Sequence, residues 1–368
     1  MAILHSSLPI KKPGLAIVWF QKQLPAANCQ WATENEELTT KTMKTNPYLD
    51  SLSLPVVAAP MFLISGPELV IECCKNGIVG TFPALNQRTT EGFDQWLTEI
   101  EEALDGYTQP DGKPAAPYGV NLIVHRTNPR VMADLEVIVK HKVPLVITSL
   151  GAVSDLVDAV HSYGGRVFHD VINRRHAEKA QEAGVDGLIC VAAGAGGHAG
   201  LLNPMPFIAE MRSFFKGTIL LSGCMSSGRD VASAMQMGAD FAYMGTRFIN
   251  VLESRAEDDY RQMIIESKTA DIVHTAAVSG VPANFMAKSL IANDIPKDLW
   301  EHKAKVDFGK ELAIPEDEKE AKAWKTIWSA GQGVTTIDDV MPVQDLIAQM
   351  KAEFREAVQE QAALLNQF

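Results

Sequence analysis

Residues 187–248 read GLICVAAGAGGHAGLLNPMPFIAEMRSFFKGTILLSGCMSSGRDVASAMQMGADFAYMGTRF. Short apolar runs at 187–192, 218–222 and 240–245 alternate here with longer segments of helical pattern. Each run is continuous, which is typical of a parallel strand that is covered on both faces. The stretch therefore predicts consecutive strand–helix units.

The same rhythm extends back toward the N-terminus as far as Leu54. Eight strands are expected, with a helix after nearly every one, and this count favours a closed (β/α)8 TIM barrel over an open doubly wound sheet. The predicted strands are Leu54–Met61, Ile78–Phe82, Tyr118–Val124, Pro144–Thr148, Arg166–Val171, Gly187–Ala192, Thr218–Ser222 and Asp240–Gly245.

The rest of the 368-residue chain is arranged around this barrel. Residues 1–50 are polar and irregular, and we expect them to form an N-terminal arm. The barrel domain is expected to comprise residues 51–250 and 325–368, including an amphipathic C-terminal helix, and residues 251–324 are expected to form a helical cap over the active site. The arm and the C-terminal helix could each mediate a homodimer or simply pack on their own barrel.

Composition excludes several classes of function. The net charge of −12 argues against nucleic acid or an anionic membrane surface as a partner, since both need a basic face. We expect no signal peptide and no membrane span, because the chain has neither pattern. Five cysteines without a C-x-x-C pair indicate reduced thiols in a cytoplasmic protein. Without H-E-x-x-H or paired cysteines, no metal site is expected.

The active site of such barrels lies at the carboxyl ends of the strands. There the glycine-rich segment 194–200 partly fits the Rossmann fingerprint, but the acidic residue expected about twenty positions later is absent. We instead expect its glycines to let the backbone run flat beneath a planar ligand. His198 would project at the edge of that ligand, where an imidazole suits proton transfer.

The loops after the last two strands form the recurrent phosphate site of these barrels. Gly223 and Gly245 lie there, and Ser226, Ser227 and Gly228 lead into a helix N-terminus that would favour a phosphate. A planar ring over one glycine-rich loop and a phosphate over two others describe flavin mononucleotide (FMN). The simpler interpretation is that these glycines only form tight turns.

These motifs together resemble the nitronate monooxygenases, formerly called 2-nitropropane dioxygenases. The resemblance covers roughly residues 54–350 and rests on AAPM (58–61), GVNLIV (119–124), AGGHAG (195–200), residues 222–248 and SAGQGV (329–334). Flavin-dependent enoyl-acyl-carrier-protein reductases and some NADH:quinone reductases share the AGGH and MGTRF segments. The motifs are therefore more specific for FMN and the barrel than for the substrate.

The resemblance implies an oxidoreductase that uses FMN and O2 to convert alkyl nitronates, such as propionate 3-nitronate, to a carbonyl compound and nitrite. It implies that His198 acts as a base toward neutral nitroalkanes or stabilises the nitronate anion. It implies FMN contacts for Ala59, Pro60, Met61, Asn121, Gly197, Gly223, Met244, Gly245 and Thr246, with Gly331 and Gln332 closing over the phosphate side. Asp170, Gly196 and Ser222 stand at the same strand ends and complete the predicted cofactor site.

The chain departs from these relatives in two places. Several relatives have a lysine on the rim of the fifth strand, where this chain has His169 and Asp170. Whether Asp170 replaces that lysine at the flavin is left open. Residues 279–284 (SGVPAN) resemble the family's S-G-R-P-A-R but lack both arginines, at Val281 and Asn284. No anion-binding role is therefore expected for them.

Three other functions remain open from the sequence. One is an NAD(P)H-dependent FMN reductase that acts on a quinone or an enoyl thioester. Another is a non-flavin lyase or aldolase that binds a phosphorylated metabolite, although no lysine stands at a strand end to form a Schiff base. The last is a non-enzymatic role, with the cap as an interaction surface.

Overall fold

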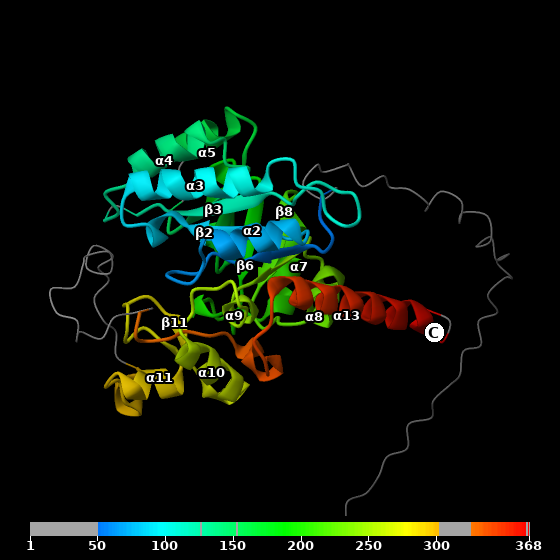
Figure 1. Ribbon diagram of the computed structural model, residues 1–368. Helices are drawn as coiled ribbons and strands as arrows, with labels where there is room; N and C mark the ends of the chain where they lie inside the picture. Colours follow the sequence, from blue (N-terminus) through cyan, green and yellow to red (C-terminus); the bar gives the residue numbers. More distant parts are fainter. Residues whose placement is uncertain (1–50, 126, 152–153, 302–324, 366, 368) are drawn as a thin grey trace, which may run out of the picture. The chain divides into compact units, whose positions relative to one another are not determined.

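A closed barrel of eight parallel strands forms the centre of the protein, in the order β1-β2-β3-β4-β5-β6-β8-β9 (Figure 1). The computed structural model describes residues 51–125, 127–151, 154–301, 325–365 and 367, so the predicted arm and residues 302–324 of the predicted cap lie outside the described residues. The predicted TIM barrel is confirmed. Its strands are β1 (Val56–Ala58), β2 (Val79–Pro83), β3 (Tyr118–Ile123), β4 (Leu145–Ser149), β5 (Arg166–Val171), β6 (Gly187–Val191), β8 (Thr218–Ser222) and β9 (Phe241–Met244).

Helices join consecutive strands and cover the outside of the barrel. The first strand is shorter than predicted because Pro55 and Pro60, which flank it, have no N–H group to donate to a neighbouring strand. The helices of the barrel are α2 (Pro67–Lys75), α3 (Thr90–Leu104), α4 (Val131–Lys140), α5 (Ser154–His161), α6 (Arg174–Glu182), α7 (Pro204–Phe214), α8 (Gly228–Met237) and the short α9 (Thr246–Ile249), with a 3₁₀ turn, η1 (Ala84–Asn86), after β2.

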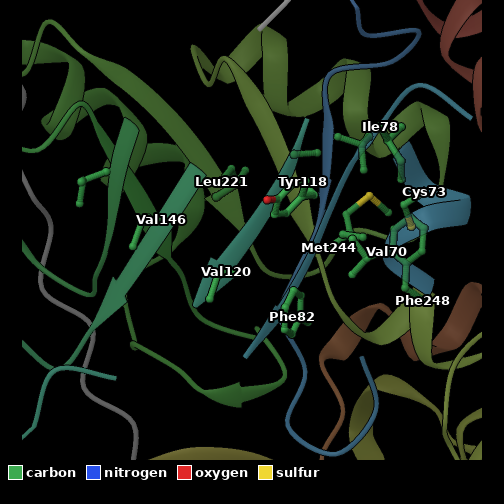
Figure 2. Packing of buried hydrophobic residues seen from close by; sticks show 14 of the residues in the cluster. Val70, Cys73, Ile78, Phe82, Tyr118, Val120, Val146, Leu221, Met244 and Phe248 are labelled. Atoms are coloured by element: carbon green, nitrogen blue, oxygen red, sulfur yellow. The ribbon is translucent and has the colours of Figure 1, made fainter. Parts of the chain in front are cut away.

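Two apolar layers stabilise the barrel, because successive side chains of a strand point to opposite faces. The outer layer lies between strands and helices, and Figure 2 shows the part of it where Cys73 of α2 and Phe248 of α9 are buried. The inner layer fills the barrel with side chains such as Ile147, Phe168 and Ile189. This alternation decides which residue at each strand end faces the interior.

The segment after the barrel strands contains a small antiparallel sheet that the sequence did not predict. The expected helix near residue 257 is present as α10 (Asp258–Glu266), and it is followed by β10 (Ile272–Thr275), β11 (Ala283–Met286) and α11 (Ala287–Ala292). The order of this sheet is β10-β11-β7, where β7 is only Gly197–His198 of the glycine-rich segment. The cap is therefore joined by strand pairing to the loop that carries the candidate base. The 3₁₀ turns of the region are η2 (Thr269–Asp271), η3 (Lys297–Leu299) and η4 (Gln332–Thr336).

The C-terminal helix α13 (Val343–Leu364) packs alongside α8 (Figure 1). The two backbones approach each other closely at Gly228, where an added Cβ would overlap the carbonyl oxygen of Met350 and would lie 2.7 Å from the backbone nitrogen of Phe354. Glu353 of α13 also accepts a hydrogen bond of 2.7 Å from the N–H of Gly228. In the part of the chain that the structure describes, no helix has the length and apolar character needed to cross a membrane.

The substitution Gly228→Ala tests this close packing. Alanine is favoured over glycine in a helix by about 1 kcal/mol, so the variant would be more stable if the space were open. We expect the opposite, a loss of roughly 1–3 kcal/mol, because overlap with Met350 forces the two helices apart. Thermal and urea unfolding would measure the change. Gln236→Ala, at an exposed position of α8, is the matched control and should not be destabilised, and equal stability of both variants would contradict the packing argument.

Candidate active site

The carboxyl ends of the barrel strands surround one large cavity of about 760 Å³, which lies in the size range of ligand pockets. Of the residues predicted to bind the cofactor or act in catalysis, Ser226, Ser227, Gly228 and Gln332 do not border this cavity, and all the others do. They are Ala59, Pro60, Met61, Asn121, Asp170, Gly196, Gly197, His198, Ser222, Gly223, Met244, Gly245, Thr246 and Gly331. The fold therefore brings together residues from six strand ends and from one later segment, around Gly331.

The polar floor of the cavity follows from strand alternation. Ile147 and Phe168 face the barrel interior, so the residues two positions later, Ser149 and Asp170, face the same way. The amide nitrogen of Asn121 donates to the Ser149 hydroxyl over 2.7 Å, and this hydroxyl donates to Asp170 Oδ2 over 2.5 Å. We call these three side chains the polar arc. Ser149 was not among the residues predicted from the sequence, although its place two residues after Ile147 was a usable signal.

Asp170 ends the polar arc with an unused oxygen. Its Oδ1 atom is buried and has no hydrogen-bond partner among the described residues. Burial raises the pKa of this carboxyl to about 6, and the Ser149 hydroxyl opposes the shift. Buried polar atoms nearly always have hydrogen-bond partners. The unpartnered Oδ1 atom therefore indicates that a bound ligand supplies the missing partner.

His169, the neighbour of Asp170, has a different environment. Its Nδ1 atom lies 2.7 Å from the Thr148 hydroxyl on the adjacent strand, and burial lowers the pKa of the ring to about 4. Strand alternation places the side chains of Thr148 and His169 toward the outer layer, although atoms of His169 also border the cavity. We therefore regard His169 as a packing residue rather than as the site's acid or base.

The cap sheet holds the glycine-rich loop in place. Gly197 and His198 pair with Asn284 and Ala283 of β11, and the N–H of Ala199 donates to Pro282 O. The side chain of Asn284 is buried, and its amide donates to Ala195 O over 2.6 Å. Its oxygen lies 3.1 Å from Nδ1 of His274. Asn284 therefore anchors the glycine-rich loop.

His198 borders the cavity from β7. Burial lowers the pKa of its imidazole to about 4, because removal from water disfavours the charged ring. The ring is therefore neutral at pH 7 and can accept a proton. A neutral imidazole fits a base better than it fits a cationic clamp for an anion.

The segment around Gly331 closes one side of the cavity. The N–H of Gly331 donates to the Thr246 hydroxyl over 2.9 Å, and the N–H of Gln332 donates to Gly194 O over 2.8 Å. A Cβ on Gly196 would lie 2.8 Å from the Gly331 nitrogen, so both loops need glycine to pack this closely. Gln332 itself does not border the cavity, and its side-chain oxygen lies 3.8 Å from the Cys224 thiol.

One predicted phosphate contact is wrong. The N–H groups of Ser226 and Ser227 both donate to Asp230 Oδ2, at 2.8 and 2.9 Å, and that of Gly228 donates to Glu353. Carboxylates of the protein thus already occupy the N-terminus of α8, which the sequence alone assigned to a phosphate. Gly223 and Thr246 remain at the cavity wall for that role.

Gly245 gives a direct test of whether a flavin fits. Its φ is −102°, which any residue can adopt, and an added Cβ would meet only ordinary contacts, at 3.7 Å from Ala59 Cβ and 3.8 Å from Met61. Protein packing therefore does not require glycine here. A side chain would instead narrow the cavity beside Ala59 and Met61, so glycine at this position leaves room for a bound ligand. With the unused oxygen of Asp170, this observation makes the residues present suitable for a flavin.

Comparison with known proteins agrees with this geometry. The family model described as nitronate monooxygenase matches residues 46–353. A nitronate monooxygenase of Paraburkholderia phytofirmans is 23% identical, and the alignment covers 85% of this chain and 95% of that protein. A nitroalkane oxidase structure from Streptomyces ansochromogenes superposes with a TM-score of 0.72 at 21% identity, over 86% of this chain and 100% of the other. The structure of FabK from Thermotoga maritima superposes with a TM-score of 0.69 at 22% identity, over 86% and 97%. The chain therefore belongs to the nitronate monooxygenase family of flavin-dependent oxidoreductases.

Proposed function

We propose that the protein is an FMN-dependent nitronate monooxygenase that uses O2 to convert alkyl nitronates, such as propionate 3-nitronate, to a carbonyl compound and nitrite. The observation that carries the proposal is His198, an imidazole kept neutral by burial and fixed by strand pairing at the wall of the cavity. A neutral base beside a redox cofactor is what the oxidation of a neutral nitroalkane requires, because the carbon that carries the nitro group must first lose a proton.

FMN would be held by backbone on one side and by side chains on the other. Gly223, Gly245 and Thr246 border the cavity at the ends of the last two barrel strands, where barrels of this type bind phosphate. Asn121 and Asp170 supply side-chain polar atoms at the floor. When bound, the flavin supplies electron transfer between the substrate and O2.

The base acts before any electron transfer when the substrate is a neutral nitroalkane. His198 removes the proton from the carbon that carries the nitro group and leaves the nitronate in the cavity. Apolar side chains at the wall, including Phe62, Leu85 and Ile123, exclude water and pack the alkyl group. A nitronate supplied as the anion needs no such proton removal.

An NAD(P)H-dependent FMN reductase acting on an enoyl thioester is the second candidate. The observation that favours it is the apolar lining, which extends to Leu150 and Ile172 and can accept a longer acyl chain. Both candidates need FMN, but they differ in the electron donor.

The first prediction concerns the cofactor and the product. The purified protein should be yellow, should release FMN on heating, and should form nitrite from propionate 3-nitronate in air without NADH. Released flavin is identified by chromatography and nitrite by a colorimetric assay. Fast NADH oxidation without nitrite would support the reductase instead, and a colourless protein that cannot be reconstituted with FMN would exclude both.

The second prediction concerns His198. His198→Asn should lower kcat/KM for a neutral nitroalkane by roughly two to four orders of magnitude, because the general base is lost. The same variant should turn over the preformed nitronate with a much smaller loss, since that substrate needs no proton removal. Steady-state oxygen consumption with both substrates measures the split. His161→Asn, in α5 with its ring paired to Asp186 on the surface, is the control. An equal loss on both substrates would assign His198 to flavin positioning instead.

A further inference from the structure

Asp170 is the only acidic side chain that borders the cavity in the described part of the chain. It makes no salt bridge with any described residue, and its one hydrogen bond comes from Ser149. The other atom of the carboxyl, Oδ1, is buried without a partner among those residues. An ionised carboxylate in this position is poorly solvated, whereas a protonated acid would need an acceptor at Oδ1.

The polar arc matches one edge of the flavin chemically. The pyrimidine edge of the ring carries two carbonyl oxygens and two nitrogens, whereas the opposite edge is a dimethylbenzene. Asn121, Ser149 and Asp170 present an amide, a hydroxyl and a carboxyl on three adjacent strands at the cavity floor. Strand pairing fixes their spacing, so the arc is a rigid array rather than a mobile loop.

No positively charged side chain on the neighbouring described elements forms a salt bridge with Asp170. Ile189 is opposite it on β6 and Ser149 lies on β4. Tyr243 of β9 is buried, and its pKa is raised by burial and then by the charge of Asp170. The remaining titratable residues of the cavity wall are His169, His176, Lys179, His198, Cys224 and Tyr260.

We propose that Asp170 is the proton-holding partner of the flavin: its carboxylate takes up a proton when the flavin is reduced, and the neutral acid donates a hydrogen bond to the pyrimidine edge. This inference rests on FMN binding, which is part of the proposed function, but not on the identity of the substrate. Reduction places extra negative charge on the ring, and a carboxylate beside it would be repelled. A neutral acid instead stabilises the reduced ring through its hydrogen bond.

The proton balance follows from linkage. Burial alone raises the pKa of Asp170 to about 6, a bound ring excludes water and raises it further, and the charge of the reduced ring raises it again. Below the pKa that Asp170 has beside the oxidised flavin, the carboxyl is protonated in both redox states. Reduction then adds two electrons and one proton to the ring, and no proton to Asp170. Between the two pKa values, Asp170 takes one more proton from solvent as the two electrons enter the ring.

The experiment compares the FMN-loaded wild type, Asp170→Asn and Ser149→Ala. Reduction potentials are measured by spectroelectrochemistry from pH 5 to 9, and proton uptake during photoreduction is measured with an indicator dye. We expect the potential of the wild type to fall more steeply with pH between the two pKa values of Asp170 than below or above them. Asp170→Asn, whose amide can donate but cannot ionise, should lose this extra uptake of about one proton per two electrons.

Ser149→Ala keeps the carboxyl and removes the hydroxyl that favours its ionised form. The extra uptake should persist in this variant, but its onset should move to higher pH. If Asp170→Asn does not retain FMN, this shift alone tests the inference. Identical proton uptake by wild type and Asp170→Asn, or an unmoved onset in Ser149→Ala, would overturn it. Nitrite formation is scored separately, so failure of the proposed substrate leaves the proton measurement valid.

Discussion

The hydrogen bonding of β1 to β9 closes the barrel, and the site exists because of that closure. The pairing sets Val57 opposite Tyr243 and Ala58 opposite Met244, and the N–H of Ala59 continues it to Met244 O. The first and last strands of the barrel thereby end side by side on one rim. Every strand then contributes its last inward-facing residue to the same floor, and the apolar layers on both faces keep these positions fixed.

The cavity at the carboxyl ends of the strands favours the uncharged forms of its titratable side chains. Burial lowers the pKa of His198 to about 4 and raises that of Asp170 to about 6. One physical cause, the loss of water around a charge, therefore moves a base and an acid in opposite directions. Pairs of groups separated in this way are typical of sites where protons move, because each group can be held in the form that the reaction needs.

The barrel was predictable because each of its strands is a short apolar run, and burial on both faces leaves that record in the sequence. The predicted glycines and His198 followed from their place after those runs. Ser149 was missed because a single serine at a strand end looks like a turn. The strand β7 has two residues and pairs with Ala283 and Asn284, far away in the chain, so no local pattern could indicate it. The hydrogen bond from the Gly228 N–H at the N-terminus of α8 to Glu353 also joins residues far apart in the chain, so it could not be predicted from a local pattern either.

The pairing of β7 with β11 constrains how a substrate can arrive. Because His198 belongs to an edge strand of the cap sheet, raising the cap would carry the base away from the floor or break the backbone ladder that orients it. The position of the base is therefore coupled to the position of the cap sheet. Leu150 and Ile172 lie at the edge of the cavity, because both border it and both are exposed to solvent.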